Sequence, residues 1–359
     1  MTAADGAGQA VWETDEFRDR ALTWIDAALA EHDLRRTGEV EERVRNWAAV
    51  YRVPTDGGVF WFKAEGRGQA FEAPLYPLLQ RLVPDRVLHP LAVDVQRAWL
   101  LLPDGGTILR QTLGDGAEAA DAMAGFLPEY ARLQIELMPH VPELLAVGVV
   151  DMSPAVMLRR FDEALVVAKR YVDVVVARGG ETTSPHPSPR SAAEVQAAYD
   201  RIVERRDRVE RQCRLLSNGA VPPSLQHDDL HDGNVFATAP DAPPRFFDWG
   251  DAVVAHPFAT LLITLRVLCD EAGVLSDDPV VHQVRDAYLE PFGLYASHAE
   301  LVELLEAACD VGKVTRSLTW ARELRAMPAD QAAEFAANQF YWLEELTVDD
   351  YLGSPPDAD

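Results

Sequence analysis

Apolar residues follow two different patterns in the two halves of the chain. From about Val40 to Pro103 they come in short runs rich in Val, Trp, Phe and Tyr, bounded by Pro, Asp and Gly. Such runs are typical of antiparallel strands joined by turns. One stretch within this region, FEAPLYPLLQRLV, has the spacing of a helix instead. This pattern predicts a small, mostly antiparallel sheet with one helix.

Helical spacing dominates the rest of the chain, both before and after the predicted sheet. Residues 179–191 form a polar stretch, GGETTSPHPSPRS, without core-forming residues, and this composition favours a loop. The helices that we predict cover residues 16–34, 118–137, 155–178, 192–217, 256–272, 279–289, 301–308 and 329–346.

These patterns predict an α+β protein with two lobes, a small antiparallel-sheet lobe and a larger, mostly helical lobe. We assign residues 1–37 to an N-terminal helical extension, 38–103 to the sheet lobe and 104–359 to the helical lobe. The composition, 48% hydrophobic and 25% charged, suits a globular protein of this size.

Several functional classes are disfavoured by the composition. The apolar runs are far shorter than a bilayer span, and the first residues lack the features of a signal peptide, so we expect a cytoplasmic protein with no membrane association. Three widely spaced cysteines form neither a disulfide framework nor a zinc motif. The net charge of -25 argues against nucleic acid and leaves room for a cationic substrate, although an acidic surface that only aids solubility gives the same value.

Ionisable residues concentrate in the stretch PSLQHDDLHDGNVF, residues 223–236, and a second acidic run, PRFFDWGD, follows at residues 244–251. If the two runs are the arms of a hairpin-like region, Asp229, Asn234 and Asp248 converge on one point. Mg²⁺ prefers a small number of hard oxygen ligands from the protein, which leave room for water and phosphates. A remaining aspartate can accept the proton of an attacking hydroxyl, as phosphoryl transfer requires.

Lysine is scarce, since only three of the 33 basic residues are lysines. Lys63 ends the apolar run VFWF and precedes Glu72, at the start of the predicted helix, by nine residues. In this arrangement an acid can hold a lysine toward nucleotide phosphates.

The residues HDDLHDGNVF match the pattern HxDxxxxN and resemble the HGDLHxGN signature of the aminoglycoside phosphotransferase and choline-kinase-like family, which has the protein-kinase-like fold. The run FFDWGDAVVAHPFATLL resembles the metal-binding strand of that family and the helix after it. The resemblance covers roughly residues 40–265 and implies a kinase that uses ATP or GTP with Mg²⁺ to phosphorylate a hydroxyl of a small molecule.

Individual roles follow from this resemblance. It implies that Asp229 is the catalytic base, that Asn234 and Asp248 hold Mg²⁺, that Lys63 contacts the nucleotide phosphates and that Glu72 positions Lys63.

Three positions depart from the family pattern. Asp228 occupies a usual glycine position, and we interpret its side chain as facing solvent rather than as raising the pKa of the neighbouring base. No glycine-rich loop lies between residues 40 and 53, so the turn at Arg45 and Asn46 would have to hold the phosphates through backbone N–H groups or the Arg45 side chain. Thr260 replaces an aspartate.

Two alternatives stay open at this point. The chain could bind a nucleotide without turnover, or it could be a metal-dependent phosphohydrolase, although such sites need a further His-Asp pair with metal-ligand spacing. The acidic helical lobe favours a cationic acceptor, such as an aminoglycoside or an amino sugar. The sequence does not determine the choice between ATP and GTP or the oligomeric state.

Overall fold

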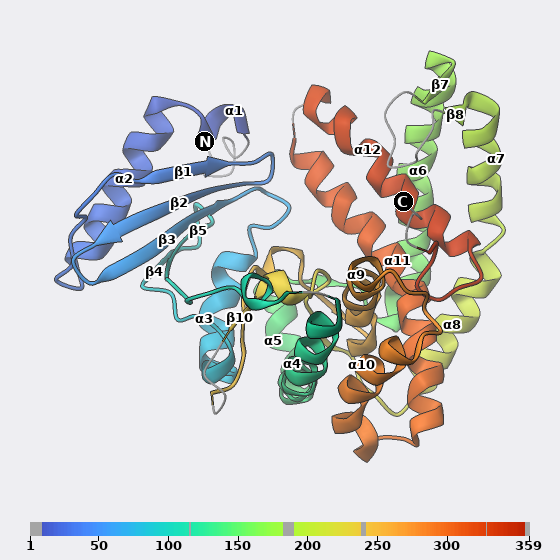
Figure 1. Cartoon of the computed structure of the whole chain (residues 1–359). Helices are drawn as coiled ribbons and strands as arrows, with labels where there is room; N and C mark the ends of the chain where they lie inside the picture. Colours follow the sequence, from blue (N-terminus) through green and yellow to red (C-terminus); the bar gives the residue numbers. More distant parts are fainter. Residues whose placement is uncertain (1–8, 115, 182–189, 238–241, 328, 356–359) are drawn as a thin grey trace.

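The computed structural model describes residues 9–114, 116–181, 190–237, 242–327 and 329–355, which form two lobes (Figure 1). The smaller lobe contains an antiparallel sheet with the strand order β1-β2-β3-β5-β4. Its strands are β1 (Glu41–Val44), β2 (Ala48–Thr55), β3 (Gly58–Glu65), β4 (Ala92–Asp94) and β5 (Trp99–Pro103).

Alternation along the strands gives this sheet two different faces. One face carries Tyr51 and Trp99, which pack against Phe17 of the N-terminal helix α2 (Asp15–Ala30), and Phe62, which packs against both of them. The short helix α1 (Gln9–Trp12) precedes α2. The opposite face carries Lys63, which therefore points away from this apolar cluster.

Helix α3 (Glu72–Leu82) connects the two lobes. It follows β3 after a short loop, and its apolar residues, including Leu75 and Leu79, belong to the large core of the helical lobe rather than to the cluster under α2. The inner residues Leu100 and Leu102 of β5 join the same core. Glu72, the first residue of α3, is thus fixed between the two lobes.

Helices make up most of the larger lobe. They are α4 (Gly116–Leu137), α5 (Val141–Ala146), α6 (Pro154–Arg178), α7 (Ala192–Val203), α8 (Arg206–Asn218), α9 (Leu261–Ala272), α10 (Pro279–Leu289), α11 (His298–Ala326) and α12 (Ala329–Glu344).

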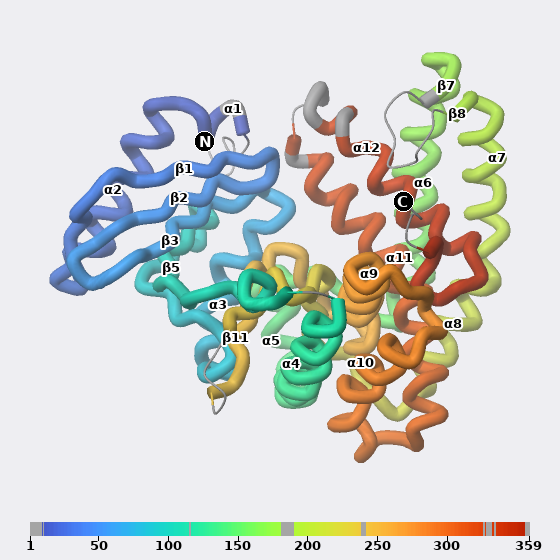
Figure 2. Tube along the Cα trace, viewed as in Figure 1, coloured from blue at the N-terminus to red at the C-terminus, as the bar shows by residue number. Residues whose placement is uncertain are grey.

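Short strands interrupt these helices where the two acidic runs lie. Strands β6 (Val150–Asp151), β12 (Val253–Ala255) and β9 (Ser224–Gln226) form one small sheet, and β10 (Val235–Phe236) pairs with β11 (Arg245–Phe246) in an antiparallel hairpin. The part of the chain that contains β9 to β12 lies between the two lobes, as the trace in Figure 2 shows.

The helix predictions differ from the structure in several places. Helices α1 and α5 match none of the predicted ranges, and the helix expected at 256–272 begins as α9 only at Leu261. The stretch 192–217 is broken into α7 and α8, and the helix expected at 301–308 extends over the whole of α11. Polar residues in the middle of α11, such as Lys313, Thr315 and Ser317, are fully buried, so this part of the helix has no polar face and no amphipathic pattern. In the predicted loop 179–191, residues 182–189 lie outside the described residues, and the two ends pair as β7 (Gly180–Glu181) and β8 (Arg190–Ser191).

Candidate active site

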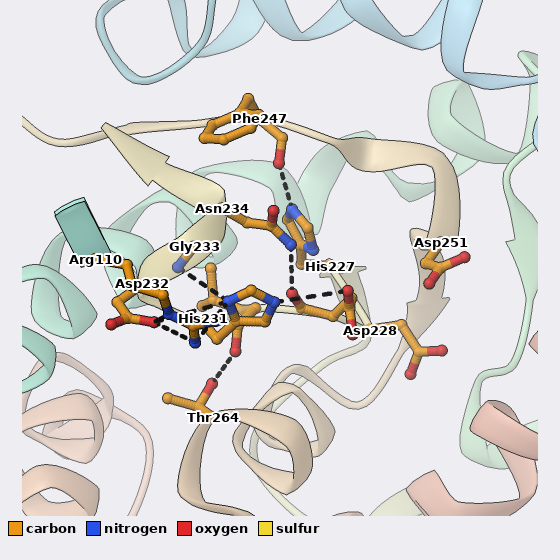
Figure 3. A network of polar contacts seen from close by, with 12 residues as sticks. Arg110, His227, Asp228, His231, Asp232, Gly233, Asn234, Phe247, Asp251 and Thr264 are labelled. Carbon is orange, nitrogen blue, oxygen red and sulfur yellow. Dashed lines mark hydrogen bonds and ion pairs between the residues drawn. The ribbon is translucent and has the colours of Figure 1, made fainter. Parts of the chain in front are cut away.

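The loop after β9 carries Asp229 and closes on itself. The side-chain amide of Asn234 donates to the backbone carbonyl of Asp229 at 2.8 Å, and the Thr264 hydroxyl on α9 donates to the carbonyl of Leu230 at 2.7 Å (Figure 3). His231 Nδ1 accepts the N–H of Gly233 at 2.9 Å and so begins the short helix η4 (Asp232–Asn234). These bonds fix the positions of Asp229 and Asn234 relative to each other.

Asp232 anchors the far side of this loop. Arg110, from η2 (Leu109–Thr112), donates through Nε to the Asp232 carboxylate at 2.8 Å. Burial opposes ionisation of this carboxyl, but His231 and Arg110 outweigh it, and the pKa of Asp232 lies below its usual value. His231 and Asp232 therefore hold the loop in place.

The β10–β11 hairpin brings Asn234 next to the strand that leads to Asp248. The Phe247 N–H donates to the Asn234 carbonyl at 3.2 Å. The ring of His227 donates from Nε2 to the Phe247 carbonyl at 2.8 Å, as Figure 3 shows. Burial lowers the pKa of His227, so the neutral ring is the form that makes this bond. His227 thereby joins the loop of Asp229 to the strand of Asp248.

Lys63 and Asp248 meet across the two lobes. Lys63 Nζ lies 2.6 Å from Asp248 Oδ1 and 2.7 Å from Glu72 Oε2, and it also lies 2.6 Å from Glu65 Oε1. The second carboxylate oxygen of Glu72 accepts the N–H of Trp249 at 2.8 Å. Glu72 therefore positions Lys63 with one oxygen and the residue after Asp248 with the other.

The electrostatics of this cluster favour full ionisation of the Lys63–Asp248 pair. Burial tends to lower the pKa of Lys63, but Asp248, Glu65 and Glu72 outweigh it and raise that pKa well above its usual value. The adjacent ammonium of Lys63 lowers the pKa of Asp248. Asp248 keeps 52% of its side-chain surface exposed, so this carboxylate stays accessible to a cation from the cleft.

A cavity of about 560 Å³ opens between the lobes at this point. It holds both Asp229 and Asp248, together with Lys63 from the sheet. Its wall consists of Arg43, Arg45, Trp47, Ala48, Val50, Trp61, Lys63, Gln69, Asp229, Asp248, Asp251, Arg316, Thr319, Trp320 and Glu323.

Arg316 of α11 is the main residue that sequence reasoning missed. Its Nη2 lies 3.3 Å from Asp229 Oδ1, and its Nη1 donates to the backbone carbonyl of Asp228 at 2.8 Å and lies 3.2 Å from Asp251 Oδ2. Burial acts to lower the pKa of Arg316, but the carboxylates of Asp229, Asp228 and Asp251 raise it. No local motif marks Arg316, because it lies far along the chain in a helix segment without an amphipathic pattern.

Asp228 does not face solvent, so that interpretation is wrong. Its carboxylate is buried and accepts hydrogen bonds from Gln226 Nε2 and Thr319 Oγ1, both at 2.9 Å. Burial raises its pKa to about 7. Its φ of 65° lies in the left-handed region, which glycine adopts freely and aspartate adopts less readily. This backbone conformation gives a physical reason for glycine at the same position of the family signature.

The turn between β1 and β2 contributes less to the site than expected. Arg45 is exposed and lines the cavity, but its backbone N–H donates to the Ala48 carbonyl at 2.8 Å and is therefore engaged. Asn46 lies in the same turn, partly buried, and is not among the cavity-lining residues. The turn also approaches the helical lobe, where the Trp47 ring packs edge-on against Phe335 at a centroid distance of 6.2 Å.

Within the described ranges, no helix has both the length and the apolar character needed to span a bilayer. In the same part of the chain, no three His, Cys, Asp or Glu side chains come together in a metal-binding arrangement. The Asn234–Asp248 pair contains only one residue of these four types.

Comparison with known proteins agrees with the motif and the fold. A family model described as the phosphotransferase enzyme family matches residues 177–301, the segment that contains Asp229, Asn234 and Asp248. The resemblance to the aminoglycoside phosphotransferase family is confirmed. The α+β, kinase-like fold and the phosphotransferase class of enzyme are confirmed with it. No curated protein sequence matches the chain at a significant level.

Solved structures with this fold align over nearly the whole chain. An ethanolamine kinase from Plasmodium vivax aligns with a TM-score of 0.60 at 10% identity, over 95% of this chain and 90% of that one. The GDP complex of an aminoglycoside 2'-phosphotransferase gives a TM-score of 0.55 at 16% identity, over 90% and 96% of the two chains. A type I macrolide 2'-phosphotransferase gives 0.53 at 14% identity, over 88% and 95%. Identities this low establish the fold and not the acceptor.

Proposed function

We propose that the protein is a small-molecule kinase that transfers the terminal phosphoryl group of ATP or GTP to a hydroxyl of a cationic acceptor. The observation that carries this proposal is the ion pair of Lys63 with both Glu72 and Asp248, at the wall of the cavity that also contains Asp229. Two regions of the chain, residues 63–72 and residues 229–248, would thus supply a phosphate-binding cation, a metal-binding carboxylate and a base to one space.

The donor set fits a magnesium site. Asp248 presents a half-exposed carboxylate that already attracts the ammonium of Lys63, and Asn234 directly precedes strand β10 of the adjoining hairpin, so both residues can supply hard oxygen atoms. Mg²⁺ bound by Asn234 and Asp248 would neutralise charge on the nucleotide phosphates. Lys63, held from behind by Glu72, would contact the same phosphates from the sheet.

Asp229 is the group that we assign to the acceptor hydroxyl. About a third of its side-chain surface is exposed in the cavity, so a hydroxyl can approach and transfer its proton to the carboxylate. Arg316, 3.3 Å from Oδ1, orients this carboxylate from the side of α11. The backbone carbonyl of Asp229 is held by Asn234, which couples the base to the metal-binding side of the site.

The wall formed by α11 suits an amine-bearing acceptor. Both carboxylate oxygens of Glu323 are buried without a hydrogen-bond partner, and burial raises the pKa of this residue to about 8. An ammonium group would satisfy the carboxylate and favour its ionised form. Trp320 beside it stacks on Phe335 at 6.1 Å, and an indole face attracts cations. Two of the similar structures are named as an ethanolamine kinase and an aminoglycoside phosphotransferase, and both names denote acceptors with amines.

The test is nucleotide consumption with Mg²⁺ across a panel of aminoglycosides, amino sugars, amino alcohols, macrolides and nucleosides. We expect ADP or GDP release that depends on an amine-bearing acceptor. Asp229→Asn should lower turnover by about 10²- to 10⁴-fold, the usual contribution of general base catalysis, with nucleotide affinity nearly unchanged.

The matched control is Asp121→Asn, which changes an exposed aspartate of α4 outside the cavity. This variant should keep the activity of the parent protein. Full turnover in Asp229→Asn would reject the assigned base, and turnover of neutral acceptors alone would reject the cationic acceptor.

A further inference from the structure

A second cavity, of about 580 Å³, lies at the junction of the two lobes and shares no lining residue with the first. The loop between β3 and α3 supplies Arg67 and Phe71 to its wall, the segment after α5 supplies Val147 and Val150, and the C-terminal part of α11 supplies Arg322. Both lobes therefore contribute to it.

The charged side chains that line this second cavity are positive, whereas the protein as a whole is negative. Its ionisable lining residues, among those that the structure describes, are three arginines, Arg67, Arg322 and Arg325, with no carboxylate in the wall. The chain as a whole carries a net charge of -25. Arg322 and Arg325, on one helix turn of this wall, place positive charge next to the cavity and favour the binding of anions there.

Arg322 is the residue that requires a ligand. Its Nε, Nη1 and Nη2 atoms are all buried and have no hydrogen-bond partner within the described residues. The guanidinium lies over the Phe71 ring at 5.7 Å, a contact with a π face that leaves the in-plane N–H donors free. A buried charged group without hydrogen bonds is costly, and charge-assisted bonds to an oxyanion would remove that cost.

Nearby carboxylates do not supply these bonds. Burial lowers the pKa of Arg322, and the charges of Asp251 and Glu323 counteract this only in part. Both carboxylate oxygens of the adjacent Glu323 are themselves without a hydrogen-bond partner. Arg325 uses its Nε for the Ala321 carbonyl of its own helix, at 3.0 Å, which leaves its Nη groups for the cavity.

We propose that this second cavity binds a small organic phosphate. Arg322 and Arg325 would bind the phosphate oxygens, and the apolar wall of Phe71, Pro74, Val147 and Val150 would contact the organic part. Because Phe71 directly precedes Glu72, a bound phosphate would also fix the segment that positions Lys63. The site is separate from the proposed phosphoryl transfer and does not depend on it.

Calorimetric titration of the whole protein with phenyl phosphate, at constant ionic strength, tests this site. Mg²⁺ and a saturating non-hydrolysable nucleotide, AMP-PNP, keep the first cavity occupied. We expect one binding event that survives the nucleotide and is tighter for phenyl phosphate than for inorganic phosphate. Arg322→Gln should weaken it by about ten- to a hundredfold, the effect of losing charge-assisted hydrogen bonds.

Two further variants keep the result interpretable. Arg325→Gln changes a more exposed member of the same wall, so it should fold normally and still weaken binding. Arg206→Gln, at an exposed arginine paired with Asp162 outside both cavities, should leave the affinity unchanged.

Either of two outcomes would overturn the proposal. Displacement of phenyl phosphate by AMP-PNP, with the same affinity for phenyl phosphate in the parent protein and in Arg322→Gln, would place the anion in the first cavity. Equal affinities of the parent protein, Arg322→Gln and Arg325→Gln would show that these arginines do not bind it.

Discussion

Two lysines of this protein lie among carboxylates, and they differ in whether a paired carboxylate is accessible from a cavity. Lys63 pairs with Asp248, whose side chain is half exposed to a cavity. Lys313 of α11 is fully buried and pairs with Asp310, which is equally buried, at 3.3 Å. Lys313 also donates to the backbone carbonyls of Glu345 and Asp350, at 3.1 and 3.0 Å, and so joins α11 to the C-terminal segment.

The pKa values of the two lysines are shifted in opposite directions. Three carboxylates raise the pKa of Lys63 despite burial, whereas burial lowers the pKa of Lys313 because Asp310 and Glu345 compensate only in part. A buried charge by itself is therefore no sign of a functional site. An ion pair with one accessible partner can exchange that partner for a ligand, whereas an enclosed pair such as Lys313–Asp310 is closed to ligands.

The largest effect on stability is expected for Lys313→Met. Removal of one partner of a buried ion pair leaves Asp310 with less compensation and should cost about 3–5 kcal/mol of unfolding free energy. Urea unfolding measures this change. The activity per folded molecule should stay at the level of the parent protein, and a loss of turnover in the folded fraction would mean that the enclosed pair also serves the active site.

Lys63→Met should produce the opposite result. It removes the cation that we place on the nucleotide phosphates, so kcat/KM for the nucleotide should fall by about 10²- to 10³-fold, as for other single groups that stabilise transition-state charge. Steady-state kinetics with varied nucleotide measures this effect. We expect a smaller loss of stability than in Lys313→Met, because Asp248 can be hydrated from the cavity.

Lys169→Met is the matched control for both lysine variants. Lys169 forms an exposed pair with Asp173 on α6, outside the first cavity. Its removal should change the unfolding free energy by less than about 1 kcal/mol and leave the kinetics unchanged. Comparable losses in all three variants would contradict the distinction between open and enclosed pairs.

The smallest effect is expected from Glu323, and it depends on pH. The folded protein keeps the Glu323 proton up to a pH of about 8, whereas the unfolded chain releases it near the usual value of 4.5. The folded state binds more protons between these limits, so the contribution of this group to stability falls as the pH rises from 4.5 to 8.

Glu323→Gln removes this titration. As the pH rises from 5 to 9, the unfolding free energy of the variant should increase by about 1–2 kcal/mol relative to that of the parent protein. This increase is smaller than the full free energy that corresponds to the shift in the pKa of Glu323. Urea unfolding at pH 5, 7 and 9 measures the difference, with Glu303→Gln, an exposed position on the same helix, as the control. Parallel stability curves for the parent and Glu323→Gln would contradict the raised pKa.

The chemistry of the first cavity could be read largely from short stretches of sequence. HxDxxxxN places Asp229 and Asn234 on one closed loop, and the run FFDWGD follows a hairpin, so local hydrogen bonds alone bring Asn234 near the strand of Asp248. The spacing of Lys63 and Glu72 likewise reflects one strand, one loop and the first turn of one helix.

The residues that came from α11 could not be predicted in this way. Arg316, Glu323 and Arg322 reach the two cavities from a helix that is buried along much of its length, and its sequence lacks the amphipathic period by which helices are recognised. The interpretation of Asp228 as solvent-facing failed for a related reason. Its burial depends on Thr319 and Arg316, which lie about ninety positions away in the chain.

The sequence by itself determined the chemical groups of the proposed phosphoryl transfer and the order of a sheet lobe and a helical lobe, because these depend on local spacing and on alternation within single elements. The tertiary structure decided which distant side chains surround those groups: the arginine beside Asp229, the unpartnered carboxylate of Glu323 and the arginine-lined second cavity. The physical reason is that burial and pairing of charges depend on contacts between elements, which no local pattern of residues records.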